Sequence, residues 1–431
     1  MSEPLLCPYA LGGINYKNGF VTSCPQQSDQ LYVIKDEKFV EPSKIINSKN
    51  FKKHRKELMS GVWSPGCHLC QETEAVGNKS MRGDFDHIKD SRSLNHYNTE
   101  TGEIDFSGLR HIELRFSNSC NMACLHCSDV YSSGWMSKLK HYHPDEDDKR
   151  YKLIQLTREF HKSTPDEDLS ISISIDEMER VVNDLNTNFP GIRKIDFAGG
   201  EVLYQKQFLP CLKMLAKHPN ADQITLTFHT NFNAKFSPEE LSEALKPFEQ
   251  SLIHISVDSG KNIYDYFRTG KWDVLVENIK RFRSINNFSK LDVVCTTSAY
   301  QVMDIYNVFE SLISLEVDSI DSSIVYTPRY INPAVMMFDF RESVLQDFKS
   351  TYNMIYDKIQ SASLNEIEKL KSAERALKNI KNYVINCNNI EYFNYESFLV
   401  YIQKTDQIWK QNFNNHFKNY QFIDNKILRV T

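Results

Sequence analysis

The 431-residue sequence contains no apolar run approaching the roughly 20 residues that cross a bilayer as a helix. It opens with Met1-Ser2-Glu3-Pro4, which lacks the positively charged start of a secretory signal peptide. The first absence argues against a membrane partner, and the second argues against secretion. We therefore expect a cytoplasmic protein.

The sequence also lacks an excess of basic residues. Its 51 lysines and arginines are outnumbered by 56 aspartates and glutamates, which gives a formal net charge of -5. Proteins that bind nucleic acid through its phosphates usually carry a basic surface. The charge balance therefore disfavours a nucleic-acid partner. For the same reason it makes the modification of RNA bases the least favoured function.

Internal repeats, low-complexity tracts and long linkers are absent as well. A chain of this length exceeds one average domain and can bury a large core. Its 41% hydrophobic and 25% charged residues are ordinary for a globular protein. We expect an irregular N-terminal region over 1–90, a central domain over 105–335 and a helical region over 336–431.

Cysteine, by contrast, is plentiful. Ten cysteines without a secretion signal favour metal or redox use over a disulfide framework. Cys120, Cys124 and Cys127 follow an alternating apolar run at 111–116, which predicts a strand. A closed zinc site needs four protein ligands, and His126 is the immediate neighbour of Cys127, which makes joint ligation of one ion awkward. A [4Fe-4S] cube held by three cysteines keeps one iron open to a ligand that is not protein.

Four more cysteines lie in the N-terminal region: Cys7, Cys24, Cys67 and Cys70. The last two form a C-x2-C knuckle, and four thiolates can close one metal site completely. Zinc and a fully ligated [4Fe-4S] cluster are both chemically allowed. A turn at Asn18-Gly19 predicts a hairpin between the first two of these cysteines. Three cysteines are scattered singly and are most simply small buried hydrophobic residues: Cys211, Cys295 and Cys387.

Strand and helix patterns alternate beyond Arg110, which favours parallel β/α units. The predicted strands cover 111–116, 192–197, 224–228, 252–257, 291–296 and 320–326. A charge-rich helical stretch covers 134–162, and a capping box over 174–177 begins another helix. Six such units predict an α/β fold built on an open, partial (β/α)6 barrel. From about Phe338 to the end, the pattern predicts helices.

Glycine and polar residues follow the predicted strands, at the rim where β/α barrels place functional groups. Gly199-Gly200-Glu201 follows the second strand. Two glycines let the backbone approach a ligand closely, and the carboxylate can accept hydrogen bonds from an ammonium group. Asn231 follows the third strand, while Ser256 and Asp258 lie two residues apart, on one face, at the end of the fourth.

The C-x3-C-x2-C loop, followed one β/α unit later by Gly-Gly-Glu, resembles the radical S-adenosylmethionine (SAM) superfamily. The resemblance covers about residues 5–330. Val202, Phe232 and Ser259 depart from it, because family members usually have proline at the first position and glycine at the other two. The resemblance implies a partial (β/α)6 barrel and a [4Fe-4S] cluster on the three loop cysteines, with SAM on the open iron.

Further roles are implied by the same resemblance. Gly199, Gly200 and Glu201 would bind the methionyl end of SAM. His126 would lie near the adenine and Ser256 near the ribose. Asn231 and Asp258 match positions that contribute to the SAM and substrate pockets.

The activity implied is reductive cleavage of SAM to a 5′-deoxyadenosyl radical that abstracts a hydrogen atom from a substrate. A reductase, flavodoxin or ferredoxin would donate the electron. The substrate predicted is a peptide or protein side chain, and the alternative is a small metabolite such as a sugar, nucleotide or amino-acid derivative. A non-catalytic zinc or iron-sulfur scaffold is the other hypothesis; the three retained loop cysteines and Glu201 speak against it.

The N-terminal cysteines, with Glu74, Gly77 and 80–82 after them, resemble the auxiliary-cluster segment of twitch-type or SPASM-like members. The resemblance implies a second, auxiliary [4Fe-4S] cluster, favoured over zinc, that serves electron transfer or structural support. Here the segment precedes the barrel instead of following it. It also has Cys24 alone where many relatives have two cysteines.

Overall fold

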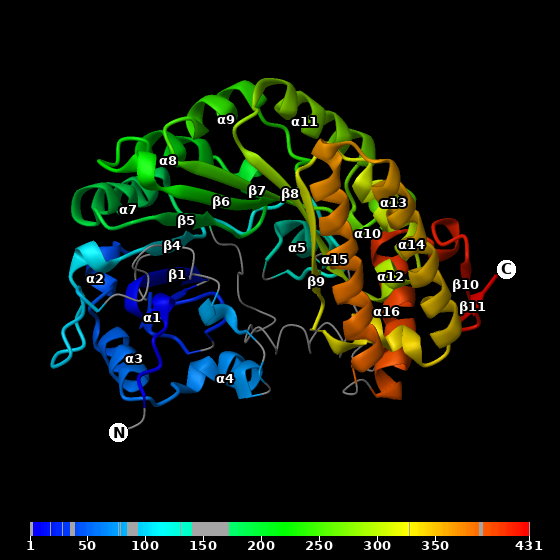
Figure 1. Ribbon diagram of the computed structural model, residues 1–431, viewed down its shortest axis with the longest axis horizontal. Helices are drawn as coiled ribbons and strands as arrows, with labels where there is room; N and C mark the ends of the chain where they lie inside the picture. Colours follow the sequence, from blue (N-terminus) through cyan, green and yellow to red (C-terminus); the bar gives the residue numbers. More distant parts are fainter. Residues whose placement is uncertain are drawn as a thin grey trace. The chain divides into compact units, whose positions relative to one another are not determined.

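A computed structural model describes residues 3–17, 19–27, 29–34, 39–75, 77, 79–83, 94–129, 131–139, 172–326, 328–387 and 391–430. The chain forms two compact units of mixed α/β structure (Figure 1). The first unit comprises Met1–Ser117, Ile171–Phe228 and Glu240–Leu252. The second comprises Asn118–Ser170, His229–Glu239 and Ile253–Thr431.

The first unit begins with a small N-terminal layer of helices and strands. Its elements are α1 (Pro8–Gly12), β1 (Gly13–Lys17), β2 (Phe20–Thr22), β3 (Tyr32–Val33), α2 (Pro42–Ile45), α3 (Lys49–Met59) and α4 (His68–Ala75). The strands β1 and β2 pair as the predicted antiparallel hairpin, although Asn18 of the predicted turn lies outside the described residues. On its other side β1 pairs in parallel with the first barrel strand, β4 (His111–Leu114).

Three barrel strands of the first unit run parallel to one another: β4, β5 (Lys194–Phe197) and β6 (Thr225–Thr230). One face of these strands is apolar, with Ile112, Ile195 and Leu226 in register. Two helices, α7 (Ile175–Asn188) and α8 (Phe208–Leu215), lie over a face of β5 and β6 (Figure 1). The predicted capping box begins α7, because Ser174 Oγ accepts from the Glu177 amide at 3.1 Å and the Glu177 carboxylate accepts from the Ser174 amide at 2.7 Å.

The β/α pattern continues with three more strands in the order β7-β8-β9; the second unit contains β8, β9 and the part of β7 from Ile253 onward. They are β7 (Gln250–Ser256), β8 (Lys290–Thr297) and β9 (Ser319–Ile324), and β8 and β9 are parallel. The helices between them are α10 (Tyr264–Arg268), α11 (Trp272–Ile285), α12 (Ala299–Val302) and α13 (Ile305–Ile313). All six predicted barrel strands are therefore present. The fold is the expected α/β partial barrel followed by a helical region.

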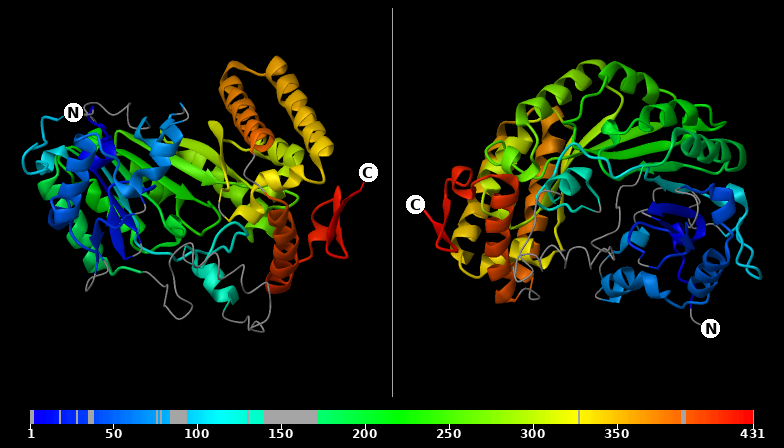
Figure 2. Two further views of the ribbon diagram at one scale, coloured as in Figure 1. Left: turned by 90° about the horizontal axis from the view of Figure 1, so that it is seen from below. Right: turned by 180° about the vertical axis from the view of Figure 1, so that it is seen from behind.

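The C-terminal region is helical, as expected, but it does not end in a helix. Its helices are α14 (Arg341–Ser361), α15 (Leu364–Asn386) and α16 (Tyr392–Trp409). Figure 2 shows α14 and α15 as an antiparallel pair. The last residues form a hairpin of β10 (Tyr420–Ile423) and β11 (Lys426–Arg429), so the prediction of helices to the end was wrong. Asp424 and Asn425 both adopt positive φ, which is the backbone of a tight hairpin turn.

The predicted helical stretch at 134–162 is described only where it begins. Ser133–Leu139 forms α5, and residues 140–171 lie outside the described residues. No helix in the described parts of the chain is long and apolar enough to span a membrane.

Candidate functional site

The three loop cysteines all lie in the second unit. Cys124 is buried, while Cys120 and Cys127 are partly exposed. Burial raises the pKa of the Cys127 thiol, and the neighbouring Cys124 and Cys120 raise it further. The charges of Cys120 and Cys124 thus oppose the ionisation of Cys127, and a bound metal centre would stabilise the thiolates together.

One side of this loop is held by the C-terminal end of α10. The amide of Leu125 donates to the carbonyl of Phe267 at 2.8 Å, and the amide of Ala123 donates to Thr269 Oγ1 at 2.8 Å. Thr269 caps α10 in the left-handed conformation, with φ at 59°. The chain that follows strand β7 therefore forms part of the support of the cysteine loop.

The other side of the loop is held by aromatic side chains, which we call the carbonyl clamp: Trp135, Tyr401 and Trp409. The distances are 3.1 Å from Trp409 Nε1 to Ala123 O, 2.7 Å from Trp135 Nε1 to Cys124 O and 2.5 Å from Tyr401 Oη to Leu125 O. Three successive carbonyls of the cysteine loop thus accept hydrogen bonds from side chains of α5 and α16.

His126 projects from the loop onto a buried ion pair. Its ring stacks on Phe267 with centroids 5.2 Å apart, and its Nε2 lies 3.4 Å from Asp258 Oδ2. Asp258 is completely buried, pairs with the Arg268 guanidinium and accepts a hydrogen bond from the Thr296 amide at 2.8 Å. Burial lowers the pKa of His126, so the imidazole is neutral near pH 7.

The other two predicted residues of this unit differ in their surroundings. Asn231 donates from Nδ2 to Asn121 Oδ1 at 2.8 Å, and so it contacts the cysteine loop directly. Ser256 is the last residue of β7 and is partly exposed. Phe232 adopts a φ of 53° where the family usually has glycine, and its ring is fully buried. The backbone turn is therefore retained although the glycine is absent.

The Gly-Gly-Glu turn belongs to the first unit, after β5. Gly199 has a φ of 87°, and a Cβ there would lie 3.0 Å from the carbonyl of Ser117. Gln205 fixes the turn by donating from Nε2 to Gly199 O at 2.6 Å and to Ser117 O at 3.1 Å. Glu201 is buried, and its Oε1 accepts from the Leu203 amide at 3.0 Å. Glycine is thus required at 199 by both conformation and space.

The N-terminal cysteines all line one cavity of the first unit: Cys7, Cys24, Cys67 and Cys70. This cavity measures about 430 Å³ with its open mouth included. The pKa of the Cys24 thiol is raised to about 12, mainly by burial and in addition by the charges of the neighbouring Cys7 and Cys70. Within the described residues, no three His, Cys, Asp or Glu side chains converge closely enough to hold a single metal ion. The four thiols are therefore neighbours without meeting at one point.

Arg82, which follows the knuckle, lines this cavity and is held in place by its neighbours. Arg82 binds Glu74 through two hydrogen bonds, at 2.8 and 2.7 Å, and Ser80 Oγ donates to the same carboxylate at 2.5 Å. The Arg82 guanidinium also lies 5.1 Å from the ring centroid of Trp63. Glu74, Ser80 and Arg82, which carried part of the sequence resemblance, thus form one connected group beside the cysteines.

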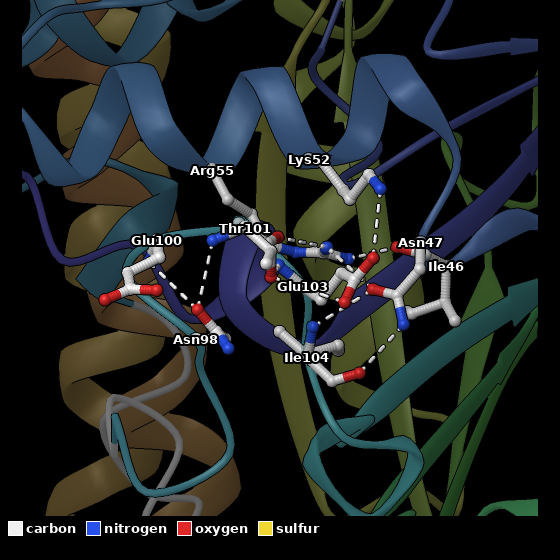
Figure 3. Close-up of polar contacts among 10 residues, drawn as sticks. Ile46, Asn47, Lys52, Arg55, Asn98, Glu100, Thr101, Glu103 and Ile104 are labelled. Atoms are coloured by element: carbon white, nitrogen blue, oxygen red, sulfur yellow. Dashed lines mark hydrogen bonds and ion pairs between the residues drawn. The ribbon is translucent and has the colours of Figure 1, made fainter.

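A buried arginine that the sequence did not single out organises the surrounding chain. Figure 3 shows Arg55 of α3 reaching the loops on either side of it. Its side chain donates to the carbonyls of Ala10 at 2.9 Å, Ile46 at 2.5 Å and Gly102 at 3.1 Å. Because Ala10 lies in α1, three residues after Cys7, this arginine fixes the segment that carries the first cysteine. Burial lowers its pKa to about 10, so it remains charged near pH 7.

The opposite face of the barrel strands in the first unit is polar. A row in register across β1, β4, β5 and β6 consists of Asn15, Glu113, Asp196 and Thr227. Asn15 is fully buried, yet neither polar atom of its side chain has a hydrogen-bond partner among the described residues. The buried Thr227 hydroxyl also lacks a partner there. Such groups usually bind water or a ligand, so this polar row is a candidate binding surface.

Residues 114–299 match the family model of the Radical SAM superfamily. The chain carries a radical SAM domain. The match includes the cysteine loop and the Gly-Gly-Glu turn, whereas the N-terminal cysteines, α14, α15 and α16 lie outside it. The family implies SAM-dependent chemistry at a [4Fe-4S] cluster, and the three loop thiols fit such a group.

Several solved radical SAM structures are similar to this chain. Native anSMEcpe with bound AdoMet is 14% identical over 58% of this chain and 62% of its own, with a TM-score of 0.37. SuiB of Streptococcus suis bound to S-adenosylmethionine is 12% identical over 75% of this chain and 64% of its own, with a TM-score of 0.34. The chain spans less than two thirds of the length of either structure. No curated protein matches the sequence significantly.

Proposed function

We propose that the protein is a radical SAM enzyme whose catalytic [4Fe-4S] cluster is held by Cys120, Cys124 and Cys127. The carrying observation is that the three cysteines lie in one loop of the radical SAM domain, where the charges of Cys120 and Cys124 both act on Cys127. When bound, the cluster and SAM supply reductive cleavage to a 5′-deoxyadenosyl radical that abstracts a hydrogen atom from substrate. The protein contributes binding, orientation and exclusion of water.

The chain's own residues divide this work between them. Gly199, Gly200 and Glu201 bind the methionyl end of SAM, since the strained turn brings backbone and a buried carboxylate together. His126 lies beside the adenine as a neutral ring, and Ser256 binds the ribose. Two further residues position their neighbours. Asn231 donates a hydrogen bond to Asn121 of the cysteine loop, and Asp258 pairs with Arg268 and lies next to the His126 ring.

The N-terminal cavity is proposed to hold an auxiliary [4Fe-4S] cluster on Cys7, Cys24, Cys67 and Cys70. A cube distributes its cysteine ligands over different irons, so they are spaced more widely than four ligands around one zinc at about 2.3 Å. Thiols that line one cavity without meeting at a point fit the cube better. With every iron ligated, this cluster would serve electron transfer or support.

The proposed substrate is a peptide or protein side chain, and a small polar metabolite is the alternative. The choice rests on the resemblance of the N-terminal cysteine segment to twitch-type and SPASM-like members, which often modify peptides or protein side chains. The unpartnered carboxamide of Asn15 can donate and accept a hydrogen bond, which fits a polar substrate of either kind. We also infer a cytoplasmic setting and a reductase, flavodoxin or ferredoxin as electron donor. The ten free cysteines support this setting, since disulfides are rare in reducing compartments.

The test is anaerobic quantification of 5′-deoxyadenosine after reconstitution, reduction with dithionite and addition of SAM. The parent should cleave SAM, and Cys124→Ala should fall to background because one iron loses its ligand. Cys211→Ala is the matched control, since it removes a buried cysteine from α8, far along the chain from the loop. Zinc bound in place of iron, or equal cleavage by Cys124→Ala, would overturn the proposal in favour of a metal scaffold.

A further inference from the structure

The carbonyl clamp joins the C-terminal helix α16 to the cysteine loop. Trp135, Tyr401 and Trp409 are each no more than 5% exposed, and the two indole rings pack edge to face with centroids 4.6 Å apart. Water therefore cannot replace a lost donor easily, and a buried carbonyl left without a partner is costly. Each bond of the clamp fixes one peptide group of residues 123–125.

The helix that carries two of the three donors is itself anchored away from the loop. Phe398 packs edge to face on Tyr300 with centroids 5.1 Å apart, and Asp406 accepts from the Tyr266 hydroxyl at 2.9 Å. Tyr401 and Trp409 are eight residues apart, a little over two helical turns, which places both toward the same side of α16. The helix is thus a fixed platform that presents donors to the loop.

The electrostatic effect follows from what each bond does to a carbonyl. A donated hydrogen bond offsets the partial negative charge of the oxygen. Groups around iron-sulfur ligands set the reduction potential, because reduction adds negative charge to the cluster. A carbonyl oxygen without a donor repels the electron that reduction adds to the cluster, which lowers the reduction potential. A carbonyl oxygen that accepts a hydrogen bond repels this electron less, so the reduction potential is higher.

We propose that Trp135, Tyr401 and Trp409 are positioning residues that hold the cysteine loop and raise the reduction potential of its cluster. This inference rests on the cluster proposed above for Cys120, Cys124 and Cys127. It gives α16 a role in the site although the helix lies outside the matched residues 114–299.

The test uses Tyr401→Phe and Trp409→Phe, which keep an aromatic ring and remove the donor. Phe398→Leu is the matched control, because it loosens a buried contact of the same helix without touching a loop carbonyl. The midpoint potential is followed by electron paramagnetic resonance on the signal that changes when SAM is added, which separates this cluster from an auxiliary one. Iron release to a chelator provides a second readout.

Both donor variants should show a lower midpoint potential than the parent, and iron release should be about fivefold faster for each lost bond. Phe398→Leu should keep the parental potential. Parental potentials in both donor variants, or an equal shift in Phe398→Leu, would overturn the inference. If Trp409→Phe does not fold, Tyr401→Phe carries the test, since it loses only one oxygen atom. Failure of the proposed function would give a different result. The parent and Cys124→Ala would then contain the same amount of iron, because the loop would hold no cluster.

Discussion

The two groups of cysteines are fixed in opposite ways. The loop site takes three cysteines from eight consecutive residues, and its backbone is bonded on both sides, by α10 and by the carbonyl clamp. The N-terminal site takes four cysteines from three segments that line one cavity, and its supporting cation, Arg55, binds the carbonyls of Ala10 in α1 and of Gly102. A site contained in one loop depends on the hydrogen bonds that hold the backbone of that loop, whereas a site assembled from several segments depends on the packing of all of them.

The largest expected effect tests whether the two sites are independent. The reconstituted parent should contain about eight irons, and Cys67→Ala should lose about four of them because one iron of the auxiliary cluster loses its ligand. The SAM-sensitive resonance signal of the loop cluster should persist in this variant, whereas Cys124→Ala should lose it. Iron and sulfide analysis with resonance spectra measures both. Loss of both signals in Cys67→Ala would show that the sites are interdependent.

The next largest effect tests whether Arg55 supports only the N-terminal cysteines and not the cysteine loop. Arg55→Met should destabilise the metal-free first unit by about 3 kcal/mol, because several buried carbonyls lose a charged donor together. Lys52→Met on the same helix is the control: it removes one half-exposed ion pair with Glu103 and should cost less than about 1 kcal/mol.

Hydrogen exchange should locate the damage of Arg55→Met. Protection is expected to fall in α1 and α3, around the N-terminal cysteines, and to remain in α16 beside the loop. Equal loss of protection in α16 would contradict the separation of the two supports. So would an effect of Lys52→Met as large as that of Arg55→Met.

The smallest expected effect is a change of pH that alters the stabilities of the two units in opposite directions. Burial lowers the pKa of His54, in the first unit, to about 4, so its stabilising contribution is complete above pH 6.5 and is lost as the pH falls toward 4. Burial raises the pKa of Asp304, in the second unit, to about 6, so its contribution is complete below about pH 4 and is lost as the pH rises through 6. Acidification from pH 7 to 5 should therefore weaken the first unit and strengthen the second by about 1 kcal/mol each.

Unfolding of the metal-free protein at the two pH values, followed by hydrogen exchange, measures these changes. His54→Gln should remove the loss in the first unit, and Asp304→Asn should remove the gain in the second. A pH slope in Asp304→Asn that equals the parental slope would rule out this carboxyl as its source.

Features with a local cause were predicted from the sequence. The six barrel strands follow from apolar patterning, and the capping box of α7 from the Ser174 and Glu177 pair. The C-x3-C-x2-C loop and the Gly-Gly-Glu turn that follows one β/α unit later together indicated the radical SAM domain, because each motif is contained in one short stretch of sequence. The roles of the individual site residues remain predictions.

Features with a distant cause were not predictable in this way. In the sequence, Arg55 is one of several polar residues of a short helix. That it is buried among backbone carbonyls can be seen only in the folded chain. For the same reason, Tyr401 and Trp409 were not singled out, since the carbonyls that they bind lie more than 270 positions earlier. The final hairpin was missed because its positive-φ turn uses Asp424 and Asn425 without a glycine.

The parallel pairing of β1 with β4 has a practical consequence for expressing the catalytic domain alone. The family match begins only at residue 114, the last residue of β4, so a fragment that keeps this strand has to begin at His111 or earlier. A fragment that begins at His111 would leave β4 without its neighbour, and the backbone amides and carbonyls that now bind β1 would become an open sheet edge. Open edges recruit strands from other molecules, so the shortened protein should aggregate. The segment before the domain therefore covers the edge of β4 with β1, in addition to carrying four cysteines. A minimal soluble fragment has to retain this segment.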